Sequence, residues 1–178
     1  MEEEIINSYL TFKVNGSLCG IHVGKVVEIM AYEQPQAKTM GLPYMMGLTQ
    51  HRDRVVPLID SGLKFGLGPI NISPQTYVVV IAVRNGSETF DVALAVDQVR
   101  EVIEITKEQQ NAIETNYKPG YVHFAAQTAD GLGIFIDADK VFTDMDVVSM
   151  AEFVADENLK LKKQALQAQQ AEETEQQQ

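Results

Sequence analysis

Short segments in which apolar and polar residues alternate recur along the chain, and this period of two is typical of β-strands. Residues 9–14 alternate in this way before Asn15-Gly16, and an apolar stretch returns at 18–23. Asn-Gly is a strong hairpin signal, because both central residues of a type I′ turn need positive φ. A matching hairpin is predicted in the second half, with strands at 77–83 and 90–96 around Asn85-Gly86.

A third hairpin is predicted over residues 47–60, where two apolar runs enclose the charged tip His51-Arg52-Asp53-Arg54. Pro57 cannot donate a ladder hydrogen bond, which favours an edge or a bulge for the returning strand. Two interpretations of the tip are open. It is either a solvated turn or a contact for a partner protein.

The other predicted elements are shorter. Residues 25–30 are apolar at 26, 27, 29 and 30, which predicts one or two helical turns. The glycines and prolines of 66–74 predict a boundary between two halves. The rest are an extended edge at 36–42, a helical turn at 61–66, a strand at 100–105, a helical turn and loop at 107–116, a hairpin at 121–126 and 132–136, and a helical turn at 137–142.

Two patterns recur at nearly the same distance. Gln50 and Ile59-Asp60 return 77 positions later as Gln127 and Ile136-Asp137. The segment 23–29 matches 96–102, which lies 73 positions on. Two matches in the same order predict one supersecondary unit used twice.

A helix is predicted at the end of the chain. Ser149 and Glu152 form a capping box, and the helix runs from Met150 into the 160s. Its apolar stripe consists of Met150, Phe153, Val154 and Leu161. Beyond Leu166 the chain is rich in Gln, Ala and Glu, which predicts a frayed tail without a core of its own.

Composition excludes several classes of function. The 178 residues carry a net charge of -11, which argues against nucleic acid and against anionic lipid surfaces. The one cysteine, Cys19, rules out a disulfide framework and is predicted to be an inert core residue. The chain opens with Met-Glu-Glu-Glu and has no apolar run near ~18 residues, so a soluble cytoplasmic protein is expected.

No catalytic pattern is visible. The sequence has neither a glycine-rich phosphate loop nor a Gly-x-Ser-x-Gly elbow. His22, His51 and His123 lack metal-ligand spacing, and His51 is predicted to be a solvated turn residue. We therefore expect neither an enzyme nor a bound metal or cofactor. Glu28 and Glu101, at equivalent repeat positions, are either solvated glutamates or equivalent partner contacts.

Over residues 8–143 the chain resembles the CheW-like domain of bacterial chemotaxis. The resemblance lies in the order and spacing of several blocks. These include Cys19-Gly-Ile-His-Val23, Lys25-Val-Val-Glu-Ile29, Val55-Val-Pro-Leu-Ile-Asp60, Tyr77-Val-Val-Val80, Ala95-Val-Asp-Gln-Val99 and Gly133-Ile-Phe-Ile-Asp137.

This resemblance implies a mainly β fold of two pseudo-symmetric, five-stranded SH3-like β-barrels with short helices and a C-terminal helix. The expected domain is 1–148, with barrels near 8–73 and 76–147 and strand exchange left open; a helix and Gln-rich tail follow at 149–178. The implied function is non-catalytic: a cytoplasmic adaptor, recruited to receptor arrays at the cell pole. It couples the cytoplasmic tip of a transmembrane chemoreceptor to the regulatory domain of the histidine kinase CheA.

The resemblance also implies a set of partner-binding residues. These are Val26, Glu28, Gly47, Gln50, Arg52, Val99 and Glu101. The family's Asn-Leu-Arg-Gly tip is here Gln50-His-Arg-Asp53, its Asp-Leu-Arg is Asp60-Ser-Gly62, and Phe124 replaces a usual glycine. Because these differences cluster at the partner surface, three alternatives stay open: an adaptor for another signalling array, a small-ligand sensor, and a competitor that occupies the adaptor position without activating the kinase.

Overall fold

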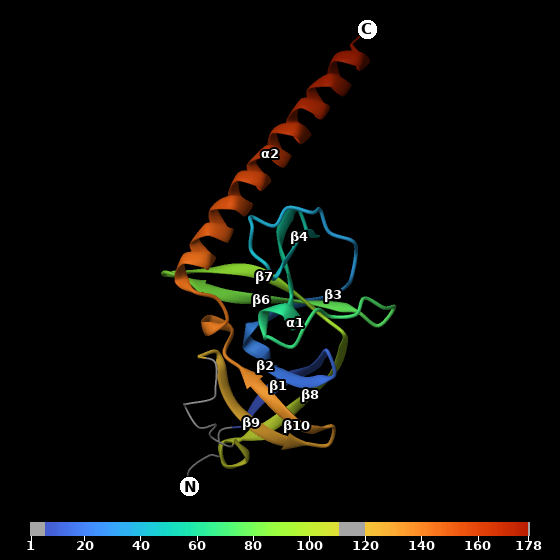
Figure 1. Ribbon diagram of the computed structural model, residues 1–178. Helices are drawn as coiled ribbons and strands as arrows, with labels where there is room; N and C mark the ends of the chain where they lie inside the picture. Colours follow the sequence, from blue (N-terminus) through green and yellow to red (C-terminus); the bar gives the residue numbers. More distant parts are fainter. Residues whose placement is uncertain (1–5, 111–119, 178) are drawn as a thin grey trace.

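The computed structural model describes residues 6–110 and 120–177, which form two five-stranded sheets and a long helix (Figure 1). Sheet A has the strand order β8-β1-β2-β10-β9, and sheet B has the order β3-β6-β7-β5-β4. The strands of sheet A are β1 (Ile6–Val14), β2 (Ser17–His22), β8 (Gln98–Thr106), β9 (Val122–Thr128) and β10 (Gly131–Ile136). Those of sheet B are β3 (Val26–Ala31), β4 (Met45–His51), β5 (Arg54–Asp60), β6 (Tyr77–Asn85) and β7 (Glu88–Val96).

The helices lie between and after these strands. They are the 3₁₀ turns η1 (Val23–Lys25), η2 (Lys107–Gln109) and η3 (Ala138–Lys140), the short α1 (Ser61–Lys64) and the long α2 (Asp144–Gln176). In Figure 1, α2 starts beside sheet B and projects away from both sheets. None of the described helices is long and apolar enough to span a membrane.

The two sheets are copies of one plan. Replacing β1, β2, β3, β4 and β5 by β6, β7, β8, β9 and β10, and the reverse, converts one strand order into the other. Ile136 pairs with Ile21 in a parallel ladder, and Ile59 pairs with Leu94 in the equivalent one. The predicted duplication is therefore confirmed.

Each sheet combines strands from both halves of the chain. Sheet A contains β1 and β2 with β8, β9 and β10, and sheet B contains β3, β4 and β5 with β6 and β7. The predicted limits 8–73 and 76–147 therefore outline neither sheet, and as domains they stay a prediction. The mainly β fold is confirmed, but the sheets are not closed barrels, because no ladder joins their outer strands within the described residues.

Two local predictions differ from the structure, and a third can be compared only in part. The helical turns expected at 25–30 are wrong, because η1 ends at Lys25 and β3 follows as an edge strand. In the extended segment expected at 36–42, only Gln36 makes a bridge, to Leu48 of β4. Of the helical turn and loop expected at 107–116, η2 is present, and residues 111–116 lie outside the described residues.

The two Asn-Gly turns are not equivalent. Asn15 and Gly16 both have positive φ, of 46° and 85°, as a type I′ turn requires. The β6–β7 hairpin instead extends to the pair Asn85–Glu88, so its loop is Gly86-Ser87, with positive φ at Gly86. The second hairpin has nine paired positions and the first has six, so the two copies differ in length here.

A core of buried side chains runs through both sheets and under α2. It includes Phe12, Ile21, Leu58, Leu94 and Met150, which are all buried. Cys19 belongs to this core, and burial raises the pKa of its thiol to about 12, which agrees with the expected inert role. A second cluster in sheet A contains Tyr9, Ile105, Phe124, Ala126 and Phe135.

Helix α2 begins earlier than the capping box predicts. Thr143 is its N-cap, and the Thr143 side chain accepts a hydrogen bond from the backbone N–H of Asp146. The predicted fraying beyond Leu166 is wrong, because the helix continues to Gln176. Ala, Gln and Glu are strong helix formers, and this segment contains neither glycine nor proline to interrupt them.

Candidate functional site

The β4–β5 hairpin presents Arg52 at its tip. His51 and Arg54 form the last pair of the ladder, so Arg52 and Asp53 make a two-residue turn. Arg52 is exposed and has a φ of 58°, whereas Asp53 has no positive φ. Positive φ at the first central residue alone is typical of a type II′ turn. The side chain of Gln50 donates a hydrogen bond to the Arg52 carbonyl at 3.3 Å.

A side-chain contact of His51 joins this tip to the edge strand β3. The His51 side chain is only 3% exposed, and its Nε2 lies 2.5 Å from Oε2 of Glu28. The predicted solvated role of His51 is therefore wrong, whereas the Glu28 side chain is 42% exposed and makes this contact with its carboxylate. Strand alternation explains the burial, because Gly47, Thr49 and His51 point to the same, buried side of β4.

The contact between Glu28 and His51 joins the two outer strands of sheet B that carry or border four of the predicted site residues. Val26 and Glu28 belong to β3, Gln50 belongs to β4, and Arg52 follows it. We call Val26, Glu28, Gln50 and Arg52 the tip surface. Because β3 and β4 are the outer strands of sheet B, this single contact bridges the open side of the sheet.

Exposed apolar side chains lie on β3 and on the strand that pairs with it. Val27 is 37% exposed and Ile29 is 42% exposed, and both belong to β3. Tyr77, which pairs with Ala31 of β3, is 42% exposed. Exposed aromatic groups are among the residues in which protein interfaces are enriched.

Val99 and Glu101 lie on the equivalent edge strand of the other sheet. Val99 pairs with Phe12 of β1 as Val26 pairs with Ile81 of β6. The structure therefore does not bring Val99 and Glu101 together with the tip surface. We call Val99, Glu101 and the 58% exposed Val102 the β8 surface.

An ion pair bridges the open side of sheet A. Arg100 of β8 donates two hydrogen bonds of 3.0 Å to Asp130, in the turn between β9 and β10. The Arg100 guanidinium lowers the pKa of the Asp130 carboxyl. Each sheet therefore has one side-chain bridge between its outer strand and the opposite hairpin tip: Glu28 with His51, and Arg100 with Asp130. Neither bridge is predicted by the sequence pattern, although the repeat matches the two tips.

Gly47 has a packing role in the structure. It is buried, with a φ of 147°, and a Cβ atom there would lie 1.9 Å from the backbone oxygen of Gln36. The same segment forms the bridge between Gln36 and Leu48, so Gly47 allows it to cover β4. A contact between Gly47 and a partner protein stays a prediction.

The relative placement of the two sheets is fixed by polar contacts as well as by the core. Lys25 Nζ lies 2.8 Å from Asp139 Oδ2, which joins η1 to η3. Asp139 also accepts a hydrogen bond of 3.0 Å from the backbone N–H of Arg84. Within residues 6–110 and 120–177, no group of His, Cys, Asp or Glu side chains is arranged to hold a metal ion.

Comparison with known proteins agrees with this architecture. The family model described as "CheW-like domain" matches residues 8–146. A chemotaxis protein CheW of Klebsiella aerogenes is 27% identical over 154 residues, covering 86% of this chain and 87% of its own length. One of Bacillus subtilis is 29% identical over 96 residues, covering 54% of this chain and 59% of its own length.

A solved structure supports the fold independently. The crystal structure of the scaffolding protein TtCheW from Thermoanaerobacter tengcongensis superposes with a TM-score of 0.68 and 21% identity, covering 80% of this chain and 91% of that one. The family model covers most of the chain and includes both sheets and their bridges. The chain therefore belongs to the family of CheW-like domains.

Proposed function

We propose that this chain is a non-catalytic adaptor in chemotaxis signalling, which binds the cytoplasmic tip of a chemoreceptor and the regulatory domain of the histidine kinase CheA. The family assignment and the names of the chemotaxis relatives support this role. The expected location is the cytoplasm, with recruitment to receptor arrays at the cell pole.

The position of Arg52 at the tip of the β4–β5 hairpin supports a partner contact there. The part-buried contact between His51 and Glu28 holds the hairpin tip beside β3 and leaves Arg52 exposed at the end of the ladder. Because the turn is already held by its ladder and by this contact, Arg52 loses less freedom on binding than it would in a loose loop. Arginine offers five donors in a rigid fork and is weakly hydrated, which suits a protein interface.

An adaptor needs two separate binding surfaces, and the duplication supplies them. The tip surface belongs to sheet B, and the β8 surface belongs to sheet A. We assign the receptor to the tip surface and the kinase domain to the β8 surface. Because different sheets carry the two surfaces, occupation of one leaves the other accessible.

Replacement of Arg52 by glutamate tests this assignment. Arg52→Glu should weaken binding to the receptor's cytoplasmic tip by more than about tenfold, or about 1.4 kcal/mol, because the charge at the centre of the contact is reversed. The free energy of unfolding should change by no more than about 0.5 kcal/mol, since the side chain is exposed. Isothermal titration calorimetry measures the first quantity, and urea unfolding measures the second.

A matched control is available on another hairpin. Arg84 is also an exposed arginine, near the tip of the β6–β7 hairpin, so Arg84→Glu makes the same charge change away from the tip surface. It should leave receptor affinity within about twofold of the unchanged chain. Equal affinities for Arg52→Glu and the unchanged chain would remove the tip from the receptor interface.

A further inference from the structure

Helix α2 is longer than its contact with the sheets requires. Its buried face consists of Val147, Met150, Val154 and Glu157. The Asn158 amide accepts a hydrogen bond of 2.8 Å from the Val55 N–H and donates one of 3.2 Å to the Val55 carbonyl. Residues 162–177 are all exposed, and Figure 1 shows this part of α2 projecting from the body.

A second apolar stripe, which we call the outer stripe, runs along α2 on the side opposite the buried face. It contains Met145, Val148, Leu159 and Leu166, which are 79%, 45%, 51% and 58% exposed. Ala155 completes it, together with Glu152 and Lys162, so its residues are separated alternately by three and four positions. This is the spacing of the seam of a coiled coil, in which one helix packs along another.

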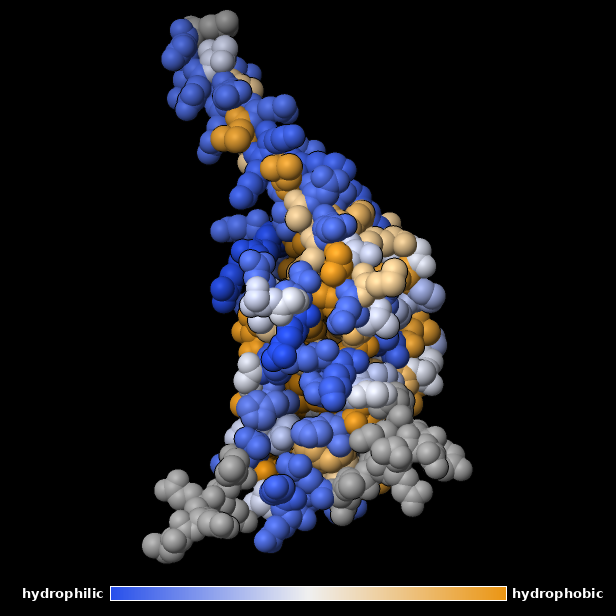
Figure 2. All heavy atoms as spheres, turned by 90° about the vertical axis from the view of Figure 1, so that its left-hand side faces the viewer, coloured by the Kyte–Doolittle hydropathy of each residue, from blue (hydrophilic) through white to orange (hydrophobic). Residues whose placement is uncertain are grey.

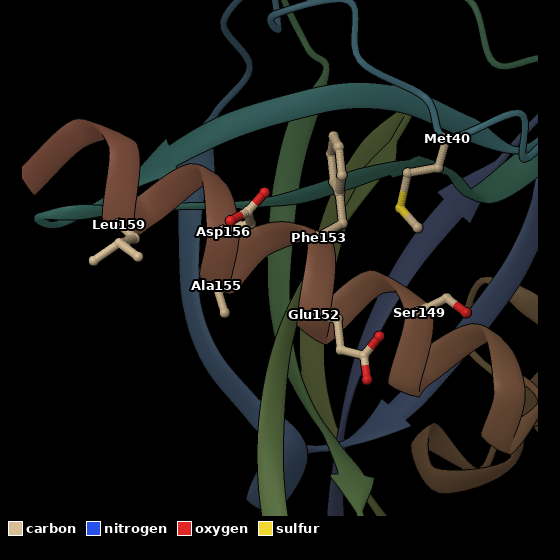
Figure 3. A pocket seen from close by; sticks show the side chains of 7 residues that line it. All are labelled: Met40, Ser149, Glu152, Phe153, Ala155, Asp156 and Leu159. Carbon is tan, nitrogen blue, oxygen red and sulfur yellow. The ribbon is translucent and has the colours of Figure 1, made fainter.

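A shallow groove borders the N-terminal half of this stripe. Met40, from the segment between β3 and β4, faces α2 across it, and the α2 residues that line it include Glu152, Phe153, Asp156 and Leu159 (Figure 3). In Figure 2, apolar atoms on the projecting helix continue toward apolar atoms on the body below it. The groove therefore widens the apolar surface where α2 leaves the sheets.

Charges divide α2 into complementary segments. Asp144, Asp146, Glu152 and Asp156 precede Lys160, Lys162 and Lys163. Among the described residues, no lysine or arginine lies within salt-bridge distance of Glu152, and none of the described acidic groups pairs with Lys162 or Lys163. In an antiparallel copy of the same helix, Lys162 can lie opposite Glu152.

We propose that two copies of this chain form a dimer through the outer stripes of their α2 helices, packed antiparallel. In one register, Leu166 lies opposite Val148, Lys162 opposite Glu152, and Leu159 opposite Ala155, while Met145 lies opposite Gln169. The Lys162–Glu152 pair inside an otherwise apolar seam fixes this register, as single polar positions do in coiled coils. The interface is self-complementary, as twofold symmetry requires.

This dimer goes beyond the adaptor role. It covers the outer stripe and part of the groove, and it uses neither the tip surface nor the β8 surface. Two linked adaptors would engage two receptors or kinases at once, which raises the effective concentration for the second contact.

Sedimentation equilibrium of the full chain tests the association. The unchanged protein should show a concentration-dependent shift from the mass of one chain to twice that mass. Leu159→Lys should raise the dissociation constant more than about tenfold, because it places a charge in the seam. The control Ile72→Lys changes a residue of 50% exposure outside α2 and should leave the dissociation constant unchanged. A single-chain mass at every concentration would overturn the proposal. The stripe would then be a contact for a different protein.

Exchanging the charges at positions 152 and 162 tests the Lys162–Glu152 pair. The mixture of two variants shows whether any loss of association comes from this pair or from misfolding of a single variant. Glu152→Lys and Lys162→Glu should each weaken self-association, since like charges then meet in the seam. An equimolar mixture of the two variants should form a mixed dimer that is tighter than either variant alone. Failure of the mixture to associate better than its components would exclude this register.

Cysteine cross-linking tests whether the two α2 helices pack antiparallel. In the antiparallel register, a mixture of Val148→Cys and Leu166→Cys chains should oxidise to a disulfide between unlike copies, and neither variant alone should link efficiently. Cys19 is buried and should not interfere. Efficient self-linking of Leu166→Cys would show a parallel pair and contradict the proposal.

Discussion

Replacing Phe135 by alanine should lower the free energy of unfolding by about 4 kcal/mol, the largest effect that we expect from a single substitution. The Phe135 ring is fully buried and stacks on Phe124 with ring centroids 4.8 Å apart. Its centroid also lies 5.3 Å from that of Tyr9 in an edge-to-face contact. The second core cluster is small, so few neighbours can move into the space that the ring leaves. Urea unfolding followed by circular dichroism measures the change.

Leu132→Ala is the matched control on the same strand. Leu132 belongs to β10 like Phe135 but is 58% exposed, so its removal should cost no more than about 0.5 kcal/mol. Near-equal effects of the two substitutions would mean that the aromatic cluster contributes little to the stability of sheet A.

Gly47→Ala should destabilise the protein by about 3 kcal/mol, from two causes that act together. A φ of 147° is strained for any residue with a side chain, and the new Cβ would lie 1.9 Å from the Gln36 carbonyl oxygen. Backbone cannot rotate aside as a flexible side chain can, so the Gln36 segment must move off β4. The same unfolding measurement gives the loss, and backbone amide exchange at Leu48 should rise with it.

Gly120→Ala provides the comparison. A Cβ at Gly120 meets nothing within 4 Å, and its φ is not in the positive region. This substitution should change stability by no more than about 0.5 kcal/mol. A Gly47→Ala protein as stable as the Gly120→Ala protein would show that the Gln36 segment does not depend on the close approach.

Hairpins and the duplication could be predicted from the sequence because both depend on local pattern. Alternation identified β1, and the repeated residues predicted that Ile59 and Ile136 occupy equivalent positions. The prediction of a helix at 25–30 failed for a physical reason. Burial alternates along β3, with Val26 and Met30 packed on the core and Val27 and Ile29 exposed. Apolar residues therefore stand on both faces of the strand, and their spacing resembles that of a helix.

Long-range contacts account for the other differences. His51 looks like a turn residue in the sequence, but it is the last ladder residue of β4, and its partner Glu28 comes from β3, 23 positions earlier in the chain. The start of α2 was ambiguous because Thr143 with Asp146 and Ser149 with Glu152 both have cap-like spacing. The structure uses the first pair, and Ser149 lies inside the helix at the groove. The strand exchange also could not be derived from local pattern, since it depends on which edges pair across the whole chain.

The most direct test of the adaptor role is whether this chain joins two partners that do not join each other. The CheA regulatory domain is immobilised, and the receptor's cytoplasmic fragment is added with and without this chain. The account predicts that the receptor fragment is retained only when the chain is present, and that Arg52→Glu abolishes this retention while the chain itself stays bound to the kinase domain. Retention without the chain, or a chain that binds neither partner, would contradict the account.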